Sequence, residues 1–322
     1  MSARFRIAVI DDFQRVAAQS TDWSPARAEG GEVAFFHDHL ADEDALVARL
    51  GDFDAIVAMR ERTPFPGALL ARLPRLKLLV ATGMFHQTID FEAAKARGIT
   101  VCGTENGPGL ATTVEHIWAM ILGLARRLHE EDAAMRAGGW QVTLPPLLAG
   151  KTLGILGLGN LGRAILPMAR ALGMRPIAWS RNLNPAAAAE AGVEVVSYER
   201  FFAESDVLTV QLKLSPRSIG YVGAAELARM KPTALLVNTS RGPVVDEAAL
   251  IEALQTGRIA GAALDVFDRE PLPADHPLRR LPNTLLSPHM GYASVETYRV
   301  FYGTAVEALA AFRSGHPIRL LG

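Results

Sequence analysis

The chain has 322 residues, of which 49% are hydrophobic and 21% are charged, a composition typical of packed globular proteins and not of disordered chains. Its 33 basic and 34 acidic residues leave a formal net charge of −1, which argues against a nucleic-acid partner and against attachment to a membrane surface. A single cysteine, Cys102, excludes an internal disulfide framework and a cysteine-rich zinc site. The first residues do not resemble a signal peptide and no apolar run could span a bilayer, so a cytoplasmic protein is expected.

The length predicts two domains, and the first of them begins with short apolar segments that alternate with helical ones. This pattern is typical of parallel sheets built from βαβ units. Helices are predicted over 42–50 and 91–97. The predicted strands of this part are 5–10, 55–58, 76–81 and 99–102.

A second series of strands follows a long helix that is predicted over 113–136. The series is long enough for a complete doubly wound sheet. Its strands are predicted at 152–156, 176–179, 207–212, 234–238, 260–265 and 284–286. A last helix, predicted over 294–313, cannot form a domain alone and is expected to pack on one of the two sheets. The predicted fold class is therefore α/β, with two doubly wound parallel-sheet domains divided near residues 112 and 293.

The strongest local signal is the sequence GLGNLG, which follows a predicted strand and opens a helical segment. Gly157 permits a tight turn, Gly159 lets the backbone approach a pyrophosphate, and Gly162 lets the helix pack on the strand. Asn160 and Leu161 complete this predicted cofactor loop, where the positive end of the helix faces the phosphates. The motif predicts a dinucleotide cofactor, and a purely structural turn is the alternative.

The strand after the glycine loop ends in Ser180 and Arg181 instead of an acidic residue. A cofactor with a free ribose 2′-hydroxyl usually meets an acid about 20 residues after the loop, yet no Asp or Glu occurs between Gly162 and Glu190. A serine hydroxyl and an arginine fork suit a 2′-phosphate. The sequence therefore favours NADP, and the alternative is a solvated Arg181 with NAD as the cofactor.

Arg241, Glu270 and His289 each follow one of the last three predicted strands. Ligands of an open α/β sheet bind beyond the carboxyl ends of its strands. These three side chains can therefore converge on a bound cofactor, and they are the candidate catalytic residues.

The motifs resemble those of the D-isomer-specific 2-hydroxyacid dehydrogenases, a family that includes glyoxylate/hydroxypyruvate reductases. The resemblance covers almost the whole chain and depends on four segments in their order and spacing, GLGNLG, NTSRG, DVFDREPLP and SPHMG. It implies a flavodoxin-like substrate domain formed by 1–112 and 294–322, with a Rossmann cofactor domain, 113–293, inserted between them. It also implies a homodimer paired through the cofactor domains, and Trp140 lies in an arm that could reach the partner subunit.

The resemblance implies catalytic roles for Arg241, Glu270 and His289. Reduction of a 2-keto acid brings a hydride to the carbonyl carbon while the carbonyl oxygen gains a proton. The guanidinium of Arg241 can hold the substrate carboxylate and polarise the carbonyl. His289 is the expected general acid, and Glu270 would fix the tautomer of its imidazole and favour the protonated form.

Three further residues are expected at the nicotinamide end of the cofactor. Asp265 matches the family position that bonds the nicotinamide carboxamide, with the capping of a turn as its alternative role. Thr239 is expected to line the nicotinamide pocket through its backbone, and Gly291, in the SPHMG segment, belongs to the same predicted site.

On the substrate side, backbone amides of a loop bind the substrate carboxylate in the family, and the matching residues here are Thr82, Gly83 and Met84. The loop, GMFHQTID, is longer than the usual family form. Arg60 or Arg62, in the charged sequence MRERT before it, could bind a second carboxylate or a polar tail of the substrate, although the charge pattern favours an exposed, ion-paired loop. His86 is expected to be solvated, as histidines in polar loops usually are, and contact with the substrate is the alternative.

The resulting function is the NAD(P)H-dependent reduction of a small 2-keto acid such as glyoxylate or hydroxypyruvate. The alternative is a dinucleotide-sensing scaffold with little turnover, similar to the transcriptional corepressors of the family. The closely spaced His37, Asp38 and His39 have no third ligand at a suitable spacing, so no metal site is predicted.

Overall fold

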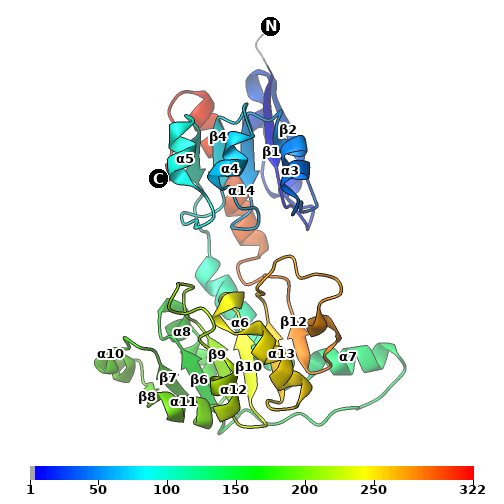
Figure 1. Cartoon of the computed structure of the whole chain (residues 1–322), viewed down its shortest axis with the longest axis vertical. Helices are drawn as coiled ribbons and strands as arrows, with labels where there is room; N and C mark the ends of the chain where they lie inside the picture. Colours follow the sequence, from blue (N-terminus) through cyan, green and yellow to red (C-terminus); the bar gives the residue numbers. More distant parts are fainter. Residues whose placement is uncertain (1–3) are drawn as a thin grey trace. The chain divides into compact units, whose positions relative to one another are not determined.

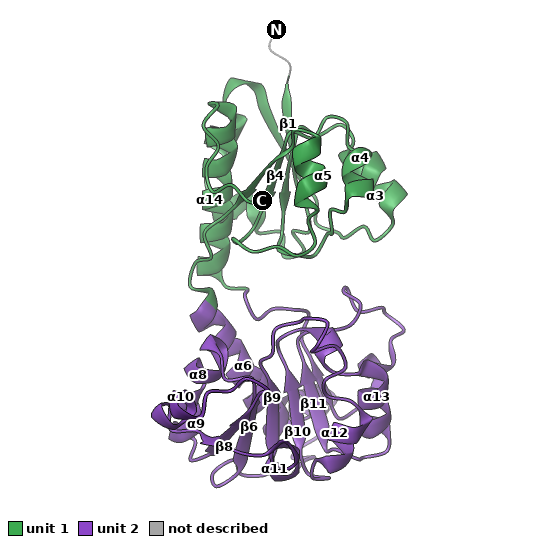
Figure 2. Cartoon of the chain, turned by 60° about the vertical axis from the view of Figure 1, so that its left-hand side comes forward, with its two compact units in different colours: residues 1–109, 293–322 green, residues 110–292 purple. Residues whose placement is uncertain are grey.

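The structure, a computed structural model, describes residues 4–322. The chain divides into two compact units: unit 1 is Met1–Gly109 with Ala293–Gly322, and unit 2 is Leu110–Tyr292 (Figure 2). Residues 1–3, which the predicted first domain includes, lie outside the described residues. The predicted boundaries near residues 112 and 293 are close to these divisions, while the assignment of a substrate domain and a cofactor domain stays a prediction.

Unit 1 is built on a five-stranded parallel sheet in the order β2-β1-β3-β4-β5, which is the flavodoxin-like order. Its strands are β1 (Phe5–Val9), β2 (Gly31–Phe35), β3 (Ala55–Ala58), β4 (Leu78–Ala81) and β5 (Thr100–Gly103). Every residue of β3 and β4 is buried, as expected for central parallel strands covered on both faces.

Helices cover both faces of this sheet (Figure 2). One face carries α3 (Glu43–Leu50), α4 (Gly67–Ala71) and α5 (Phe91–Ala96). The other carries α1 (Ala17–Ser20), α2 (Ser24–Arg27), followed by the 3₁₀ turn η1 (Ala28–Gly30), and α14 (Val295–Arg313). The α14 helix starts at the N-cap Ser294, whose side chain accepts the amide of Thr297, and its buried face includes Phe301 and Leu309. The prediction that the last helix packs on one of the sheets is confirmed.

Unit 2 contains a seven-stranded parallel sheet in the order β12-β11-β10-β9-β6-β7-β8 (Figure 1). Its strands are β6 (Thr152–Leu156), β7 (Arg175–Trp179), β8 (Glu194–Val195), β9 (Val207–Val210), β10 (Leu235–Asn238), β11 (Gly261–Leu264) and β12 (Thr284–Leu286). The strand order reverses between β6 and β9, and such a switch point opens a crevice at the carboxyl ends of the strands. The predicted α/β class with two doubly wound parallel sheets is confirmed.

Two hydrophobic cores enclose the sheet of unit 2. The helices of one face are α6 (Gly109–Ala125), α8 (Asn160–Ala164), α9 (Leu166–Ala171) and α10 (Pro185–Glu190). Those of the other face are α11 (Tyr198–Glu204), α12 (Ala224–Arg229) and α13 (Glu247–Gln255). Two 3₁₀ turns, η2 (Gly242–Val244) and η3 (Pro277–Arg280), lie in the connections after β10 and β11. Among residues 4–322, no helix has the length and apolar character needed to cross a membrane.

The single helix predicted over 113–136 is wrong, because the chain forms two helices there. The α6 helix ends at Ala125, and α7 (Leu128–Arg136) starts after Arg127, whose φ of 51° is left-handed. A left-handed residue cannot continue an α-helix, so the chain turns at this point. Unlike α6, α7 contains no buried residue, and Figure 1 shows it projecting from unit 2.

Candidate active site

The three glycines of the GLGNLG loop have different surroundings. Gly157 has a φ of +99°, and a Cβ there would lie 3.0 Å from the carbonyl oxygen of Gln211. A Cβ on Gly162 would lie 2.6 Å from the carbonyl oxygen of Gly157, whereas the Cβ position of Gly159 has no neighbour within 4 Å among the described residues other than the adjoining chain. Gly159 and Asn160 are exposed. The packed outer glycines and the open central one form a cradle that fits a pyrophosphate.

The carboxyl end of β7 lies directly beside this loop, because the Gly157 amide donates to the carbonyl oxygen of Trp179 at 3.0 Å. Ser180 and Arg181 follow at once, and Arg181 is exposed. Trp179 stacks on Tyr221, with ring centroids 5.7 Å apart. Burial raises the pKa of the Tyr221 hydroxyl, and the charge of Arg181 opposes that shift.

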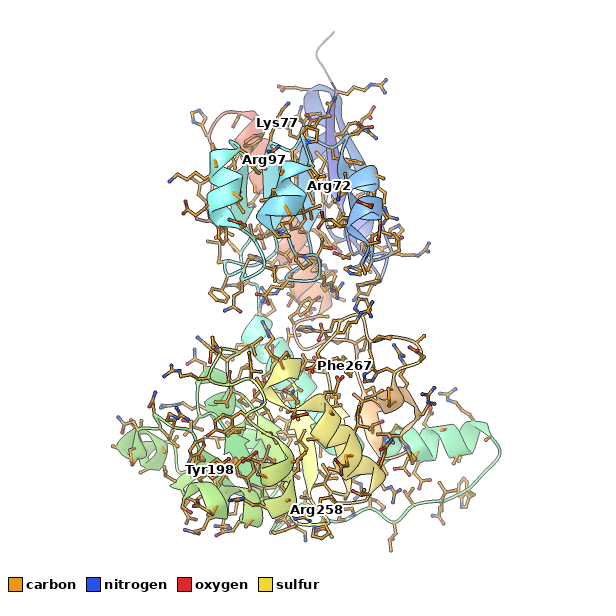
Figure 3. All side chains as sticks on the ribbon, in the orientation of Figure 1. Arg72, Lys77, Arg97, Tyr198, Arg258 and Phe267 are labelled. Carbon is orange, nitrogen blue, oxygen red and sulfur yellow. The ribbon has the colours of Figure 1, made fainter. Side chains whose placement is uncertain are left out.

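A carboxylate near the same aromatic cluster is already engaged. Glu226 accepts hydrogen bonds from the Tyr198 hydroxyl and from the Gly223 amide. Burial and these contacts with Glu226 raise the pKa of Tyr198. Tyr198, the first residue of α11, is labelled in Figure 3.

The candidate catalytic residues follow three neighbouring strands, with Arg241 after β10, Glu270 after β11 and His289 after β12. The loops that carry the first two residues are in contact. A Cβ on Gly242 would lie 2.1 Å from the carbonyl carbon of Phe267, the residue labelled in Figure 3. Only glycine therefore fits beneath the loop that leads to Glu270, and this contact holds the Arg241 segment against it.

Local polar contacts hold the backbone around Arg241 in place. The Asn238 side chain donates to the carbonyl oxygen of Arg241 at 2.9 Å and accepts the amide of Ser240 at 3.1 Å. Arg241 Nη1 donates to the carbonyl oxygen of Ser240 at 2.8 Å. Thr239 is buried, and its hydroxyl accepts from the Gln211 side chain at 3.3 Å.

His289 and Glu270 form a close pair, with 2.6 Å between Nδ1 and Oε2. The other carboxylate oxygen of Glu270 accepts the amide of Phe267 at 2.9 Å. Both side chains are about one-third exposed, at 30% for His289 and 33% for Glu270. Because Glu270 engages Nδ1, the ring presents Nε2 as the nitrogen that can reach a substrate.

Asp265 is buried beneath this pair, with 1% of its surface exposed. Its carboxylate accepts the amides of Met290 and Gly291 at 2.8 and 2.9 Å, and His116 Nε2 lies 3.0 Å from Oδ1. Burial alone would raise the pKa of Asp265, but the hydrogen bond and charge of His116, together with hydrogen bonds from Ser287 and Met290, lower it. These contacts give Asp265 a capping role, and its bond to a carboxamide stays a prediction.

The sequence analysis missed His116, which reaches Asp265 from α6. The available signal was a histidine near the start of a helix whose next residues are apolar. Its partners, however, lie far along the chain and could not be identified from spacing.

In unit 1, the loop after β4 already uses two of the amides predicted to bind substrate. The Thr82 amide donates to the carbonyl oxygen of Ala58 at 3.0 Å, and the Gly83 amide donates to Thr104 Oγ1 at 2.7 Å. Met84 and Phe85 follow at the surface, 42% and 65% exposed. Met84 is thus the first residue of the loop that presents itself to solvent.

Arg60 and His86 both contact Gly83. Arg60 donates from its amide to Thr82 Oγ1 at 2.8 Å, and a Cβ on Gly83 would lie 2.2 Å from Arg60 Nη1. The guanidinium therefore lies on the loop backbone and is not fully exposed. The expectation that His86 is solvated is wrong, because the side chain is 6% exposed. Burial, and then the charge of Arg60, lower the pKa of His86.

The closely spaced histidines of unit 1 pair with carboxylates. His37 Nδ1 lies 3.1 Å from Asp12 Oδ2, and His39 Nδ1 lies 2.8 Å from Asp11 Oδ1. Over residues 4–322, no group of three or more His, Cys, Asp or Glu side chains is arranged to hold a metal ion.

Known proteins resemble this chain in sequence and in structure. The sequence model of the D-isomer specific 2-hydroxyacid dehydrogenase NAD binding domain matches residues 118–291. The glyoxylate reductase of Korarchaeum cryptofilum is 37% identical over 278 residues, which cover 84% of this chain and 82% of that protein. The glyoxylate reductase of Aeropyrum pernix is 42% identical over 258 residues, which cover 77% of this chain and 76% of that protein.

The crystal structure of a phosphoglycerate oxidoreductase from Vibrio cholerae has a TM-score of 0.89 with this chain. The two sequences are 36% identical, and the match covers 97% of this chain and 99% of that one. The similarity therefore includes both units.

Proposed function

Because this chain belongs to the D-isomer-specific 2-hydroxyacid dehydrogenase family, an oxidoreductase family that uses NAD(P), we propose that it reduces a small 2-keto acid to the D-2-hydroxy acid. Glyoxylate and hydroxypyruvate are the first candidate substrates, and two of the relatives above are named glyoxylate reductases. The observation that carries the proposal is the 2.6 Å contact between His289 and Glu270 at the ends of neighbouring strands, next to the strand that leads to Arg241.

In the proposed mechanism, Arg241 binds the substrate carboxylate and the carbonyl oxygen. Its planar guanidinium offers paired donors in a fixed geometry, so that the substrate is held in one orientation. The contacts of Asn238 and Ser240 with the Arg241 segment keep this side chain in place.

His289 donates the proton from Nε2 to the carbonyl oxygen as the carbonyl carbon is reduced. Glu270 accepts from Nδ1, which fixes the ring tautomer and stabilises the charged imidazolium before transfer. When bound, the nicotinamide cofactor supplies the hydride. The 2-keto acid thus gains one hydride and one proton, and the imidazole is left neutral.

The cofactor would be held by two groups of residues in unit 2. The pyrophosphate group consists of Gly157, Gly159, Asn160, Leu161 and Gly162. The nicotinamide group consists of Thr239, Asp265 and Gly291. The open space at Gly159 supports the first group, and the positions of Thr239, Asp265 and Gly291 beyond the neighbouring strands β10, β11 and β12 support the second.

We propose that NADP is preferred over NAD, through Ser180 and Arg181. Both follow β7 directly beside the glycine loop, where the adenosine ribose lies in such folds. The carboxylate of Glu226, which would repel a 2′-phosphate, is engaged by Tyr198 and Gly223. An arginine fork favours a phosphate over a hydroxyl.

For the substrate loop we propose that Met84 offers the backbone amide, while Thr82 and Gly83 shape the loop. Arg60 lies on the same loop through its contacts with Thr82 and Gly83. A cation at this position favours a substrate with a polar tail or a second carboxylate over one without.

We further propose a homodimer paired through unit 2. The α7 helix and the arm after it expose six large apolar side chains: Leu128 at 58%, Met135 at 51%, Trp140 at 74%, Val142 at 56%, Leu144 at 93% and Leu147 at 69%. An apolar surface of this kind marks a contact with another protein, and a second copy would cover it. Light scattering should give a dimer mass, and Leu144→Asp should yield a monomer. A monomeric wild-type protein would overturn this proposal.

The direct test of the reaction is a panel of glyoxylate, hydroxypyruvate, pyruvate and phenylpyruvate, each with NADPH and with NADH. Turnover would be followed by loss of the reduced-cofactor absorbance, and the product's configuration by chiral chromatography. Turnover to a D-2-hydroxy acid is expected. Tight cofactor binding with negligible turnover of every acid would favour the dinucleotide-sensing scaffold instead.

A further inference from the structure

A buried polar cluster lies under the segment that carries His289. His116, from the first half of α6, has a side chain that is 19% exposed. Its Nε2 lies 3.0 Å from Asp265 Oδ1 and 3.2 Å from Ser287 Oγ. A carboxylate can only accept, so Nε2 carries the proton that His116 donates to Asp265.

These contacts hold the chain on both sides of His289. Ser287 precedes His289 by two residues, and Asp265 accepts the amides of the two residues that follow it, Met290 and Gly291. Gly291 fits closely here, since a Cβ would lie 3.2 Å from Asp265 Oδ2. One histidine of α6 therefore contacts the start of the segment directly and its end through a carboxylate.

The segment needs such support because His289 has a φ of 56°. A residue other than glycine in this left-handed region is strained, and it persists where surrounding contacts determine the backbone. The 2.6 Å contact of His289 with Glu270 depends on this backbone direction. A change that loosened the segment would turn the imidazole away from Glu270.

We infer that His116 is a positioning residue for His289: by holding Ser287 and the Asp265 carboxylate, it fixes the segment 287–291 so that the imidazole is aimed for proton transfer. This inference rests on the proposed function, which assigns the proton transfer to His289. The lowered pKa of Asp265, to which His116 contributes, agrees with a permanently charged anchor. His116 itself does not contact the reacting atoms in this assignment.

The test uses the 322-residue protein in the oligomeric state in which it is purified. The variants are His116→Leu, His116→Gln and the control His276→Leu. The control removes a matched pair in the same unit, because His276 Nε2 lies 3.0 Å from Glu247 and its side chain is 17% exposed. In His116→Leu, kcat should fall by about tenfold, a part of the roughly 10²- to 10⁴-fold that a positioned general acid contributes. The KM for the 2-keto acid should change little, because Arg241 still binds the carboxylate.

His116→Gln keeps an N–H donor near the position of Nε2 and should restore most of kcat. Amide hydrogen exchange, measured without substrate or cofactor, supplies a readout independent of turnover. Exchange across 287–291 should become faster in His116→Leu and stay at the wild-type rate in His116→Gln and His276→Leu. If His116→Leu does not fold, Ser287→Ala, which removes one of the two contacts, should accelerate the same amides to a smaller degree.

Unchanged exchange across 287–291 in His116→Leu, or a loss of kcat that His116→Gln does not restore, would overturn the inference. A failure of the proposed function would give a different experimental result. In that case the wild-type protein would turn over no 2-keto acid, while the exchange rates would still decide whether His116 holds the segment.

Discussion

Both units end their parallel strands in polar loops, but the contacts that hold these loops differ. In unit 2, the loops are held by pairs of a histidine and a carboxylate, His116 with Asp265 and His289 with Glu270. In unit 1, the loop after β4 is held by the Thr104 hydroxyl and by Arg60 lying on Gly83, and it presents Phe85 to solvent. Under the proposed function, unit 2 would supply the groups that any 2-keto acid needs, and the loop of unit 1 would discriminate among acids.

The largest effect is expected in unit 2, from His289→Ala. Loss of the general acid should lower kcat by roughly 10²- to 10⁴-fold for every 2-keto acid alike. Cofactor affinity, measured by fluorescence titration, and the thermal unfolding temperature should stay close to wild type. A near-normal kcat would remove His289 as the acid and would break the assignment of general chemistry to unit 2.

The second effect concerns the cofactor. Arg181→Ala should reduce the preference for NADPH over NADH by about 10-fold or more, because a hydrogen bond to a charged group contributes about 1.5–3 kcal/mol. The kcat/KM with NADH should hardly change, which separates a 2′-phosphate contact from general damage. Arg163→Ala, on α8, is a suitable control for loss of a surface arginine. A wild-type preference for NADH that Arg181→Ala leaves unaltered would contradict the proposal.

A smaller effect, on selectivity, is expected in unit 1. Arg60→Ala should lower kcat/KM for hydroxypyruvate by about 10-fold, since its hydroxyl tail would lose a charged partner, and should affect glyoxylate little. The control is Arg97→Ala, which removes an arginine of the same unit that lies outside the loop. Arg97 is labelled in Figure 3. Equal losses for both acids would show that Arg60 supports the loop without selecting the substrate.

The smallest effect is on the stability of unit 1. The folded protein lowers the pKa of His86, so the unfolded chain takes up a proton more readily than the folded one. The contribution of neutral His86 to the free energy of unfolding is fully present above the ordinary histidine pKa. It is lost as the pH falls from that pKa toward the lowered pKa of His86 in the folded protein. Urea unfolding between about pH 7.5 and pH 5, which spans the ordinary histidine titration, should show a smaller acid loss for His86→Gln than for wild type. His316→Gln, at an exposed position, should behave as wild type, and an unchanged acid loss in His86→Gln would refute this role.

The sequence predicted most of the sheet because central strands are continuous apolar runs. β3 and β10, for example, lie close to their predicted ranges. β2 was missed because this edge strand is half-exposed and interrupted by Glu32, and β8 because it has two exposed residues. The break between α6 and α7 occurs at Arg127, without a glycine or proline to mark it.

The site could be predicted in part for a similar reason. The glycine loop between a strand and a helix can be predicted from local spacing. The strand pattern also places Arg241, Glu270 and His289 after strands, but their catalytic roles come from the family resemblance and stay a prediction. The burial of His86 and the role of His116 depend on tertiary contacts, and His116 meets Ser287 across 171 positions of the chain. Neither the distance nor the partner can be read from a single sequence.

The close fit of Gly242 beneath Phe267 restricts how this protein can diverge. A side chain at 242, or an insertion in either loop, would push apart the two backbones that carry Arg241 and Glu270. Length changes should therefore accumulate elsewhere, and the stretch around Met84 and Phe85 offers such freedom. A laboratory library aimed at new substrates would gain more viable clones from randomising that stretch than from randomising the neighbours of Gly242.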